Sequence, residues 1–457
     1  MGYDGDVKAI VEQDQQIMVP GLSDEAGAGA YVAAAIKQAF QPNAEEIAQL
    51  EEFVDEVLFK KRSDINWNRT PGKDVADEIN RAYNYVWPAA CYWSLYRVGR
   101  AYPHLLKTHD WQWYLALAYR TVVRGMQSDI GYNTEGLMGE TVFGEILTNL
   151  RRENMTEDAE KLEGAMRKRV DEWRNQQYPF GSEQSWDSTG QEGVYFWARY
   201  FQEAGMVSRA KNSVLGYMPT VPHWGYDGNA RRYWDFTVGG MLKLIERQIH
   251  HYGSGLNALV MLSAFRDDPS DSYLLRVGYA GTSGPLANIQ KDGFASCAMH
   301  AWPEHLFWDG YSGDYGPNFV GLALGSGTYL VEDAEVGPVV YGGVAKIRGH
   351  LITVQVRDPL RQKTFVAPLG LEVRVDAGVI EEFTYNLRTR KLSLTLGQRE
   401  NGPKAEAAIV WVSTVADLTE SEGFRVIRDD VGVGLERGGR KVALKSQWKV
   451  NITIEQV

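Results

Sequence analysis

The stretch YPFGSEQSWDSTGQEGVYFW (178–197) places three carboxylic acids, Glu183, Asp187 and Glu192, among amide, hydroxyl and aromatic side chains. Cleavage of a glycosidic bond uses such acids, because one carboxyl group donates a proton while an ionised one activates water or attacks directly. Glu183 lies in a Gly-Ser-Glu turn close to Trp186, an indole that would raise the pKa of the acid by excluding water. We therefore interpret Glu183 as a catalytic or binding acid, or as a carboxylate that braces its own loop.

Asp187 has a structural alternative. It precedes a run of apolar residues at helical spacing, and Ser188 with Gln191 three residues later has the form of a capping box. If a helix begins near residue 188, Glu192 is turned from Asp187 by roughly 140° about the helix axis. The two acids then face different directions. Asp187 remains a catalytic candidate with Glu192 in reserve, and a second carboxylate must come from another loop.

The segment GYNTEGLMGETVFGE (131–145) offers that second acid. Glu140 stands on a Gly-punctuated loop that leads into an apolar periodic run, as Glu183 does one hairpin later in the chain. Its alternative role is to complement the positive end of a helix, an effect of roughly 0.3–1 kcal/mol. Tyr132 in the same loop is a candidate for substrate binding.

The segment RQIHHYGSGLNA (247–258) supports a different chemistry. His251 and Tyr252 could remove the C5 proton of a sugar acid and protonate the leaving oxygen, while Arg231 neutralises the sugar carboxylate. That reaction would make the protein a polysaccharide lyase. A histidine that only braces its loop is the structural alternative.

Aromatic residues and aspartates gather in further predicted loops. Indole faces stack on the C–H face of pyranose rings, and carboxylates accept hydrogen bonds from sugar hydroxyls. We therefore assign substrate binding also to Trp186, Trp234, Trp308 and Asp309. The pairs at 227–229 and 309–314 could hold calcium through oxygen ligands, but neither has the full spacing of a known loop. We expect no cofactor, with calcium as the alternative.

Apolar residues recur at helical spacing before about residue 290, and each run closes at Gly, Pro or Asn. Short and long connections alternate between the runs, with Asn43 and Ser270 as expected N-caps. These features predict helices over 26–40, 43–60, 83–102, 110–127, 140–152, 155–175, 188–204, 206–216, 238–249, 254–266 and 270–279.

After about residue 319 the period changes to two. In HLITVQVR (350–357), Ile352, Val354 and Val356 fall on one face of a strand. The predicted fold class is therefore α+β multidomain, with an (α/α) toroid of about six helical hairpins over 1–318 and an antiparallel β-sandwich over 319–457. The long connections would gather at one end of the toroid and surround a cleft.

The composition narrows the range of partners. A formal charge of −11 disfavours binding to nucleic acid or to an anionic membrane surface. The first residues contain no signal-peptide core, and no window approaches an 18-residue apolar span. Cys91 and Cys297 lie far apart in small or apolar contexts, so we expect two buried thiols and no zinc site.

Four stretches resemble a bacterial family of unassigned function found in large carbohydrate-associated proteins. They are VPGLSDEAGAG (19–29), YPFGSEQSWDSTGQEGVY (178–195), HYGSGLNALVMLSAFRDDPSDSYLLRVGYAG (251–281) and DGYSGDYGPNFVG (309–321). The resemblance implies a toroid shaped like those of glycoside hydrolases and polysaccharide lyases, and a secreted or periplasmic location. It also implies a further N-terminal β-domain and a secretion signal, so the chain would be a partial or short member. It assigns no catalytic residue.

The sequence thus predicts a carbohydrate-active enzyme, a glycoside hydrolase that cleaves an oligo- or polysaccharide with paired carboxylates. The candidate acids are Glu183, Asp187 and Glu140, with Glu192 in reserve. A polysaccharide lyase centred on His251 and Tyr252 is the first alternative. A non-catalytic glycan-binding protein, whose carboxylates only brace loops, is the second.

Overall fold

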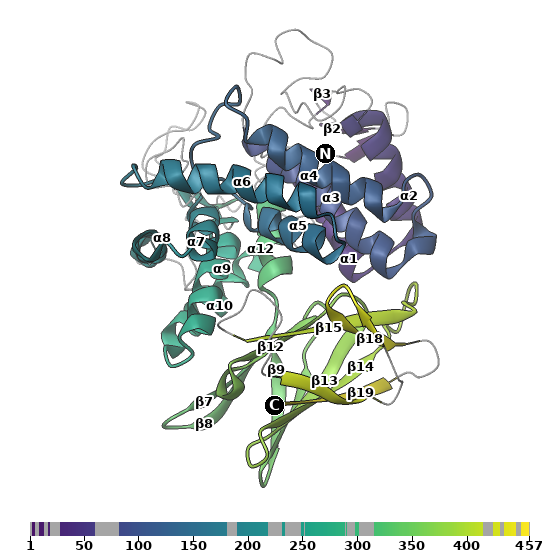
Figure 1. Ribbon diagram of the computed structural model, residues 1–457, viewed down its shortest axis with the longest axis vertical. Coiled ribbons are helices and arrows are strands. Elements are labelled where there is room, and N and C mark those ends of the chain that lie inside the picture. The colour runs from purple at the N-terminus through teal and green to yellow at the C-terminus, as the bar shows by residue number, and fades with distance from the viewer. Residues whose placement is uncertain are drawn as a thin grey trace.

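A computed structural model gives the arrangement of the chain (Figure 1). The residues that it describes are 2–4, 9–12, 17–18, 28–59, 82–180, 190–217, 231–233, 248–250, 252–287, 289, 298–300, 315–414, 424–429, 434–444 and 449–456.

Six helices form what we call the helix ring. Each contacts the next in chain order, and the last contacts both the fifth and the first, so the contacts close on themselves. The helix ring consists of α1 (Ala28–Phe40), α3 (Tyr83–Ala101), α5 (Thr141–Arg152), α7 (Gln191–Tyr200), α9 (Tyr252–Asp267) and α12 (Tyr315–Gly325).

A second set of helices alternates with the helix ring along the chain, and each of its first five members contacts the ring helix that it follows. This set consists of α2 (Ala44–Phe53, extended by a π-helical turn over Val54–Phe59), α4 (Trp111–Gly125), α6 (Thr156–Trp173), α8 (Ala204–Tyr217), α10 (Ser272–Gly281) and the short α11 (Gly284–Ala287).

Side-chain hydrogen bonds to backbone N–H groups cap the starts of α2 and α10. The side chain of Asn43 accepts hydrogen bonds from the N–H groups of Glu45 and Glu46, so the predicted cap of α2 is confirmed. The predicted cap at Ser270 is wrong. Asp271 caps α10 instead, because its carboxylate accepts from two backbone N–H groups of the first turn.

Two further helix predictions need correction. The helix predicted over 238–249 lies mostly outside the described residues, and its last residues form a strand, β5 (Gln248–His250). The helix α12 was not predicted, since its sequence YGPNFVGLALG is rich in glycine. Packing explains it: a Cβ on Gly321 would lie 2.3 Å from the backbone of Gly255 in α9. Glycine therefore lets two ring helices touch, and burial outweighs its low helix propensity.

The strands after α12 form two large sheets. The seven-stranded sheet has the order β17-β18-β15-β12-β11-β7-β8 and the six-stranded sheet the order β16-β19-β14-β13-β10-β9. Their bounds are β7 (Thr328–Asp333), β8 (Gly337–Tyr341), β9 (Gly343–Arg348), β10 (Leu351–Val356), β11 (Lys363–Val366), β12 (Leu371–Val375), β13 (Val379–Asn386), β14 (Lys391–Gly397), β15 (Ala407–Thr414), β16 (Phe424–Asp429), β17 (Leu435–Glu436), β18 (Gly439–Ala443) and β19 (Lys449–Gln456).

Both large sheets contribute to one apolar core, which includes Val354 and Phe383 from one sheet and Val373 and Val410 from the other. The predicted alternation in β10 is confirmed, since Ile352 and Val354 are buried. The pairing is antiparallel except between β7 and β11, which run parallel. The predicted boundary between residues 318 and 319 falls inside α12, so the last ring helix continues beyond it.

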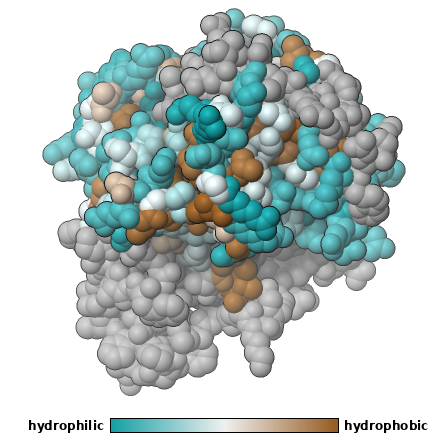
Figure 2. All heavy atoms as spheres, turned by 90° about the horizontal axis from the view of Figure 1, so that it is seen from below, coloured by the Kyte–Doolittle hydropathy of each residue, from teal (hydrophilic) through white to brown (hydrophobic). Residues whose placement is uncertain are grey.

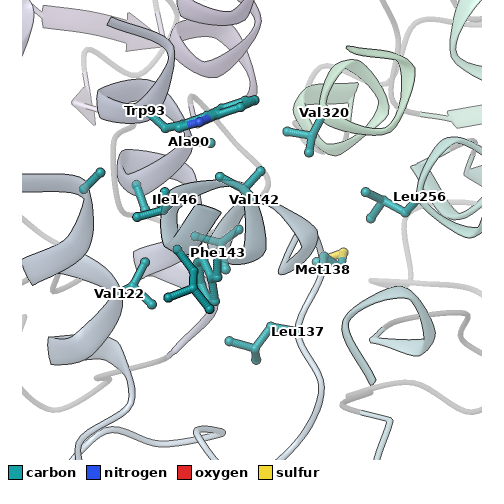
Figure 3. Close-up of a cluster of buried hydrophobic side chains, with 14 of the residues drawn as sticks. Ala90, Trp93, Val122, Leu137, Met138, Val142, Phe143, Ile146, Leu256 and Val320 are labelled. Atoms are coloured by element: carbon teal, nitrogen blue, oxygen red, sulfur yellow. The ribbon is translucent and has the colours of Figure 1, made fainter. Parts of the chain in front are cut away.

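The helix ring has its own apolar core. Figure 3 shows Trp93 of α3, Val142 of α5, Leu256 of α9 and Val320 of α12 within one buried cluster. On the face in Figure 2, hydrophilic residues cover much of the described surface and hydrophobic ones gather near its centre.

Two small three-stranded sheets complete the described structure. One joins β1 (Gly2–Asp4), β2 (Ala9–Glu12) and β3 (Ile17–Met18). The other joins β4 (Arg231–Tyr233), β5 and β6 (Ala298–His300), and β4 contacts α9.

Candidate functional site

The two ends of the helix ring differ in their neighbours. At the C-terminal ends of the ring helices, Arg100 pairs with Glu436 at 2.8 Å and Arg266 with Glu372 at 2.9 Å. Both carboxylates belong to the seven-stranded sheet, so this sheet lies against the C-terminal end of the helix ring (Figure 1). The opposite end, where the N-termini of the ring helices lie, we call the loop end.

Long connections enter the helix ring at the loop end. Residues 126–140 precede α5, 174–190 precede α7, 218–251 precede α9 and 288–314 precede α12. The joints at the other end are short, for example 153–155 after α5. The predicted alternation of short and long connections is confirmed, and most of the candidate residues belong to the long ones.

The structure brings together the two acid-bearing loops that the sequence singled out. The N–H of Gly136 donates to the carbonyl oxygen of Pro179 at 2.8 Å, and Gly136 forms a parallel bridge with Phe180. A Cβ on Gly190 would lie 2.3 Å from the carbonyl oxygen of Gly136. Only glycine fits there, and Gly190 also has a φ of +84°, which other residues rarely adopt. These contacts hold Pro179, Phe180 and Gly190, the described residues on either side of 181–189, next to the loop of Glu140.

Glu192 lies in the first turn of α7 and is 3% exposed. Its carboxylate accepts hydrogen bonds from the backbone N–H of Gly139 at 3.1 Å and of Thr141 at 2.8 Å, and so joins the start of α7 to the start of α5. Burial raises the pKa of Glu192 to about 7. The nearby Glu140 adds to that rise, while the hydrogen bonds oppose it.

Glu140 is completely buried and paired. Its Oε1 lies 2.6 Å from the guanidinium of Arg169 on α6 and accepts from the N–H of Leu137 at 2.9 Å. Burial raises its pKa, and Arg169 opposes that rise. A Cβ on Gly193 would lie 2.8 Å from its Oε2, so Glu140 packs directly on α7. The alternative of a carboxylate that holds its loop therefore has structural support.

Arg169 fixes the shape of the loop 131–140. Its guanidinium donates to the carbonyl oxygens of Asn133 (2.8 Å) and Glu135, in addition to the pair with Glu140. The sequence analysis missed Arg169. The spacing of the residues on α6 could have revealed Arg169, because it continues the buried apolar stripe of Leu162 and Met166. A cation at such a position needs a buried partner.

A cavity of about 160 Å³ extends from this site into the helix ring. Its lining residues include Glu192 and Thr141 at the starts of α7 and α5, Tyr195 and Ser263 of the ring helices, and Arg374 and Trp411 of the seven-stranded sheet. The ionisable Glu192 is therefore one of the residues that line this cavity.

The structure describes three of the other candidate site residues. Tyr132 is exposed, and its ring lies 5.8 Å from that of Tyr83. Tyr252 begins α9, and Arg231 begins β4. The remaining candidates lie outside the described residues: Glu183, Trp186, Asp187, Trp234, His251, Trp308, Asp309 and the calcium alternatives at 227–229 and 309–314.

The small sheet β4-β5-β6 brings a different set of residue types together. Its register places Arg231 opposite His250, and Gln248 opposite both Tyr233 and His300. Because residues opposite each other and residues two apart share a face, Arg231, Tyr233, His250 and His300 belong to one face. The sequence analysis missed the last three, because strands of three residues give no readable periodicity.

The described residues contain neither a candidate metal site nor a candidate membrane-spanning helix. No three His, Cys, Asp or Glu side chains in the described ranges come together as a metal site requires. Among the helices that the structure describes, none has both the length and the apolar character needed to cross a membrane.

The chain belongs to the family of unknown function DUF5695, which its sequence matches over residues 1–68 and 60–452. The resemblance to a family of unassigned function is thus confirmed. A search of curated proteins gives no match.

Solved structures show a likeness of fold. A polysaccharide lyase matches with a TM-score of 0.52 at 19% identity, over 71% of this chain and 46% of the lyase. The chain therefore spans less than half the length of that structure. A GH127 β-L-arabinofuranosidase from Geobacillus stearothermophilus T6 matches with a TM-score of 0.45 at 9% identity, over 94% of this chain and 71% of that one. A glycoside hydrolase matches with a TM-score of 0.43 at 11% identity, over 94% and 72%.

Proposed function

We propose that the protein is a carbohydrate-active enzyme that cleaves an oligo- or polysaccharide at the loop end of the helix ring. In this proposal the helix ring, which ends at Gly325, is an (α/α) toroid, and the large sheets that follow it form a β-sandwich. The closed order of ring contacts and the core shared by the two sheets support that division. The enzyme would be secreted or periplasmic, with a polysaccharide as its partner.

The observation that carries the proposal is the junction of the two acid-bearing loops. The contacts of Gly136 with Pro179 and Gly190 hold the two described ends of the segment 181–189, which includes Glu183 and Asp187, beside the loop of Glu140. Acid–base cleavage of a glycosidic bond needs two carboxyl groups close together, roughly 5 to 9.5 Å apart according to mechanism. The loop junction is an arrangement that can satisfy this need.

The proposed chemistry is hydrolysis. Glu183 and Asp187 remain the proposed acid and base. Glu192 is the described acid best suited to hold a proton near neutral pH, because its pKa is about 7 and it lines the cavity. Glu140 would position the loop through Arg169 and keep the pKa of Glu192 high. Tyr132, Trp186, Trp234, Trp308 and Asp309 would bind the sugar rings, and no step requires a cofactor.

A polysaccharide lyase is the second candidate, and the register of the small sheet favours it. Removal of the C5 proton of a sugar acid needs a base, a proton donor and a cation for the carboxylate. Arg231, Tyr233 and His250 belong to one face of the sheet β4-β5-β6, and β5 ends two residues before Tyr252, the first residue of α9. His251 follows β5 directly and stays within this proposal.

The experiment is a cleavage screen against neutral and uronic-acid polysaccharides, read by new reducing ends, ultraviolet absorbance and product mass. Hydrolysis adds one water per bond cleaved and gives no absorbance, whereas elimination gives an absorbing double bond without added water. We expect cleavage that falls at least 100-fold in Glu183→Gln or Asp187→Asn, but not in Glu160→Gln on the exposed side of α6. Glycan binding without cleavage by the wild type would overturn the enzyme proposal in favour of a binding protein.

A further inference from the structure

A second cavity, of about 100 Å³, lies where the C-terminal ends of α3 and α5 meet the seven-stranded sheet. It adjoins the cavity of about 160 Å³, with which it shares Arg152, Lys363 and Trp411 as lining residues, but Glu192 and Thr141 line only the larger cavity. Residues from ring helices and from the sheet line the smaller one, among them Trp93, Arg97, Arg152, Gln362, Lys363 and Trp411.

The carboxylates at this cavity already have partners. Glu145 lies 3.0 Å from Arg374, and Asp376 pairs with Arg437. Glu153, which follows α5, lies 2.9 Å from Arg100. These ion pairs therefore neutralise the carboxylates near the cavity.

Two guanidinium groups at the cavity have no such partner. Arg97 lies 4.9 Å from the ring centres of both Phe40 and Trp93, and Arg152 lies 4.0 Å from that of Trp411. Among the described residues neither guanidinium has a hydrogen-bond acceptor or an ion pair, and the carboxylate of Glu145, already paired with Arg374, attracts both from a longer distance. Both are partly buried, and stacking leaves the N–H edge of a guanidinium open to a planar anion.

Other polar groups of the cavity also have few hydrogen-bond partners. Among the described residues, Lys363 donates only to the carbonyl oxygen of Leu324, at 2.7 Å. The indole N–H of Trp93, a side chain that is 3% exposed, has no acceptor in the same part of the chain. One acceptor is also unused, the Oε1 of the buried Gln362. A buried cation or donor without a partner costs free energy, which a bound ligand can recover.

We propose that this cavity binds a small hydroxylated carboxylate, such as a sugar acid. The carboxylate would lie between Arg97 and Arg152 near Lys363, and a hydroxyl group would donate to Gln362. The volume of about 100 Å³ is smaller than that of the roughly 150 Å³ cavity known to hold benzene, and it admits a carboxylate together with the carbon and hydroxyl group next to it. The site does not rest on the proposed function, because it is argued from Arg97, Arg152 and Gln362 and uses none of the candidate acids.

Calorimetric titration of the full chain with sodium glucuronate, sodium sulfate and glucose, at one ionic strength set by sodium chloride, tests the proposal. The variants are Arg97→Gln and Arg152→Gln. The matched control is Arg167→Gln, an exposed arginine of α6 that also lies over an aromatic ring, 3.6 Å from the centre of Phe201. Circular dichroism and melting confirm that each variant is folded.

We expect glucuronate to bind the wild type and the control equally, and each cavity variant at least tenfold more weakly. Glucose should not compete with it. Equal affinity in all four proteins would overturn the proposal, because binding would then lie elsewhere. Binding of sulfate but not of glucuronate would overturn the assignment to a hydroxylated acid, and glucose binding as tight as that of glucuronate would overturn the role of the charge.

Discussion

At the residue scale, Glu192 combines burial with two hydrogen bonds from the backbone. The hydrogen bonds favour its ionised form, and burial beside Glu140 favours the neutral form more strongly. A carboxyl group with this balance changes charge near neutral pH. The structure therefore gives this loop junction a pH dependence that exposed acids do not have.

Glu192→Gln tests this balance. The pKa of Glu192 is raised from about 4.5 to about 7 on folding, so its favourable contribution is complete below pH 4.5 and is lost as the pH rises through 7. Relative to the variant, the wild type should lose about 3 kcal/mol of unfolding free energy between pH 4.5 and pH 8. Urea unfolding of both proteins at several pH values measures the difference.

The exposed Glu160→Gln, on α6, is the control for this titration and should show no such pH-dependent difference. A constant difference between the wild type and Glu192→Gln from pH 4.5 to 8 would show that Glu192 stays ionised throughout. The proposed role of Glu192 as a proton donor would then be wrong.

At the element scale, close approach of ring helices depends on glycine. Gly321 of α12 lies against Gly255 of α9, backbone to backbone. Because backbone atoms cannot turn aside as a side chain can, an added methyl group must push the two helices apart. The closing contacts of the helix ring therefore depend on a residue that has a low intrinsic helix propensity.

Gly321→Ala should accordingly destabilise the protein by roughly 1–3 kcal/mol. The matched control is Gly164→Ala in α6, where a Cβ would meet nothing within 4 Å. That substitution should stabilise the protein by up to about 1 kcal/mol through helix propensity alone. Thermal and urea unfolding measure both effects. Stabilisation by both substitutions would contradict the close packing of α9 and α12.

The same contact explains what the sequence could reveal about the elements. Helices such as α4 and α5 show their apolar spacing in sequence, and the strands β10 and β14 alternate clearly, so all four were predictable. The glycines of α12 weaken its helical signal, and only tertiary packing makes it a helix. The three-residue strand β5 carries too short a pattern to be distinguished from the end of a helix.

For the candidate site, the sequence indicated the relevant loops but not the contacts between them. Acids on loops before helices indicated which connections matter, and the structure ties two of those loops together at Gly136. The hydrogen bonds of Glu192 to Gly139 and Thr141 were not predictable, because they join residues about 50 positions apart. The spacing on α6 indicates that Arg169 needs a buried partner, but it does not indicate that this partner is Glu140.

At the scale of the whole molecule, the two ends of the helix ring have different roles in this account. The seven-stranded sheet covers the C-terminal end, where ion pairs and the arginine-lined cavity lie. The long connections enter at the loop end, where the acid-bearing loops meet. Polysaccharide cleavage is assigned to the loop end, because only there do the long connections gather around the N-termini of the ring helices.

Hydrogen exchange measured with and without the oligosaccharide selected by the cleavage screen, in the Glu183→Gln variant, tests that assignment most directly. Bound sugar should slow exchange in residues 128–139, 176–190 and 248–252 and leave the strands β9 and β10 unchanged. Slower exchange confined to the large sheets, with none in the three connections, would contradict a carbohydrate site at the loop end.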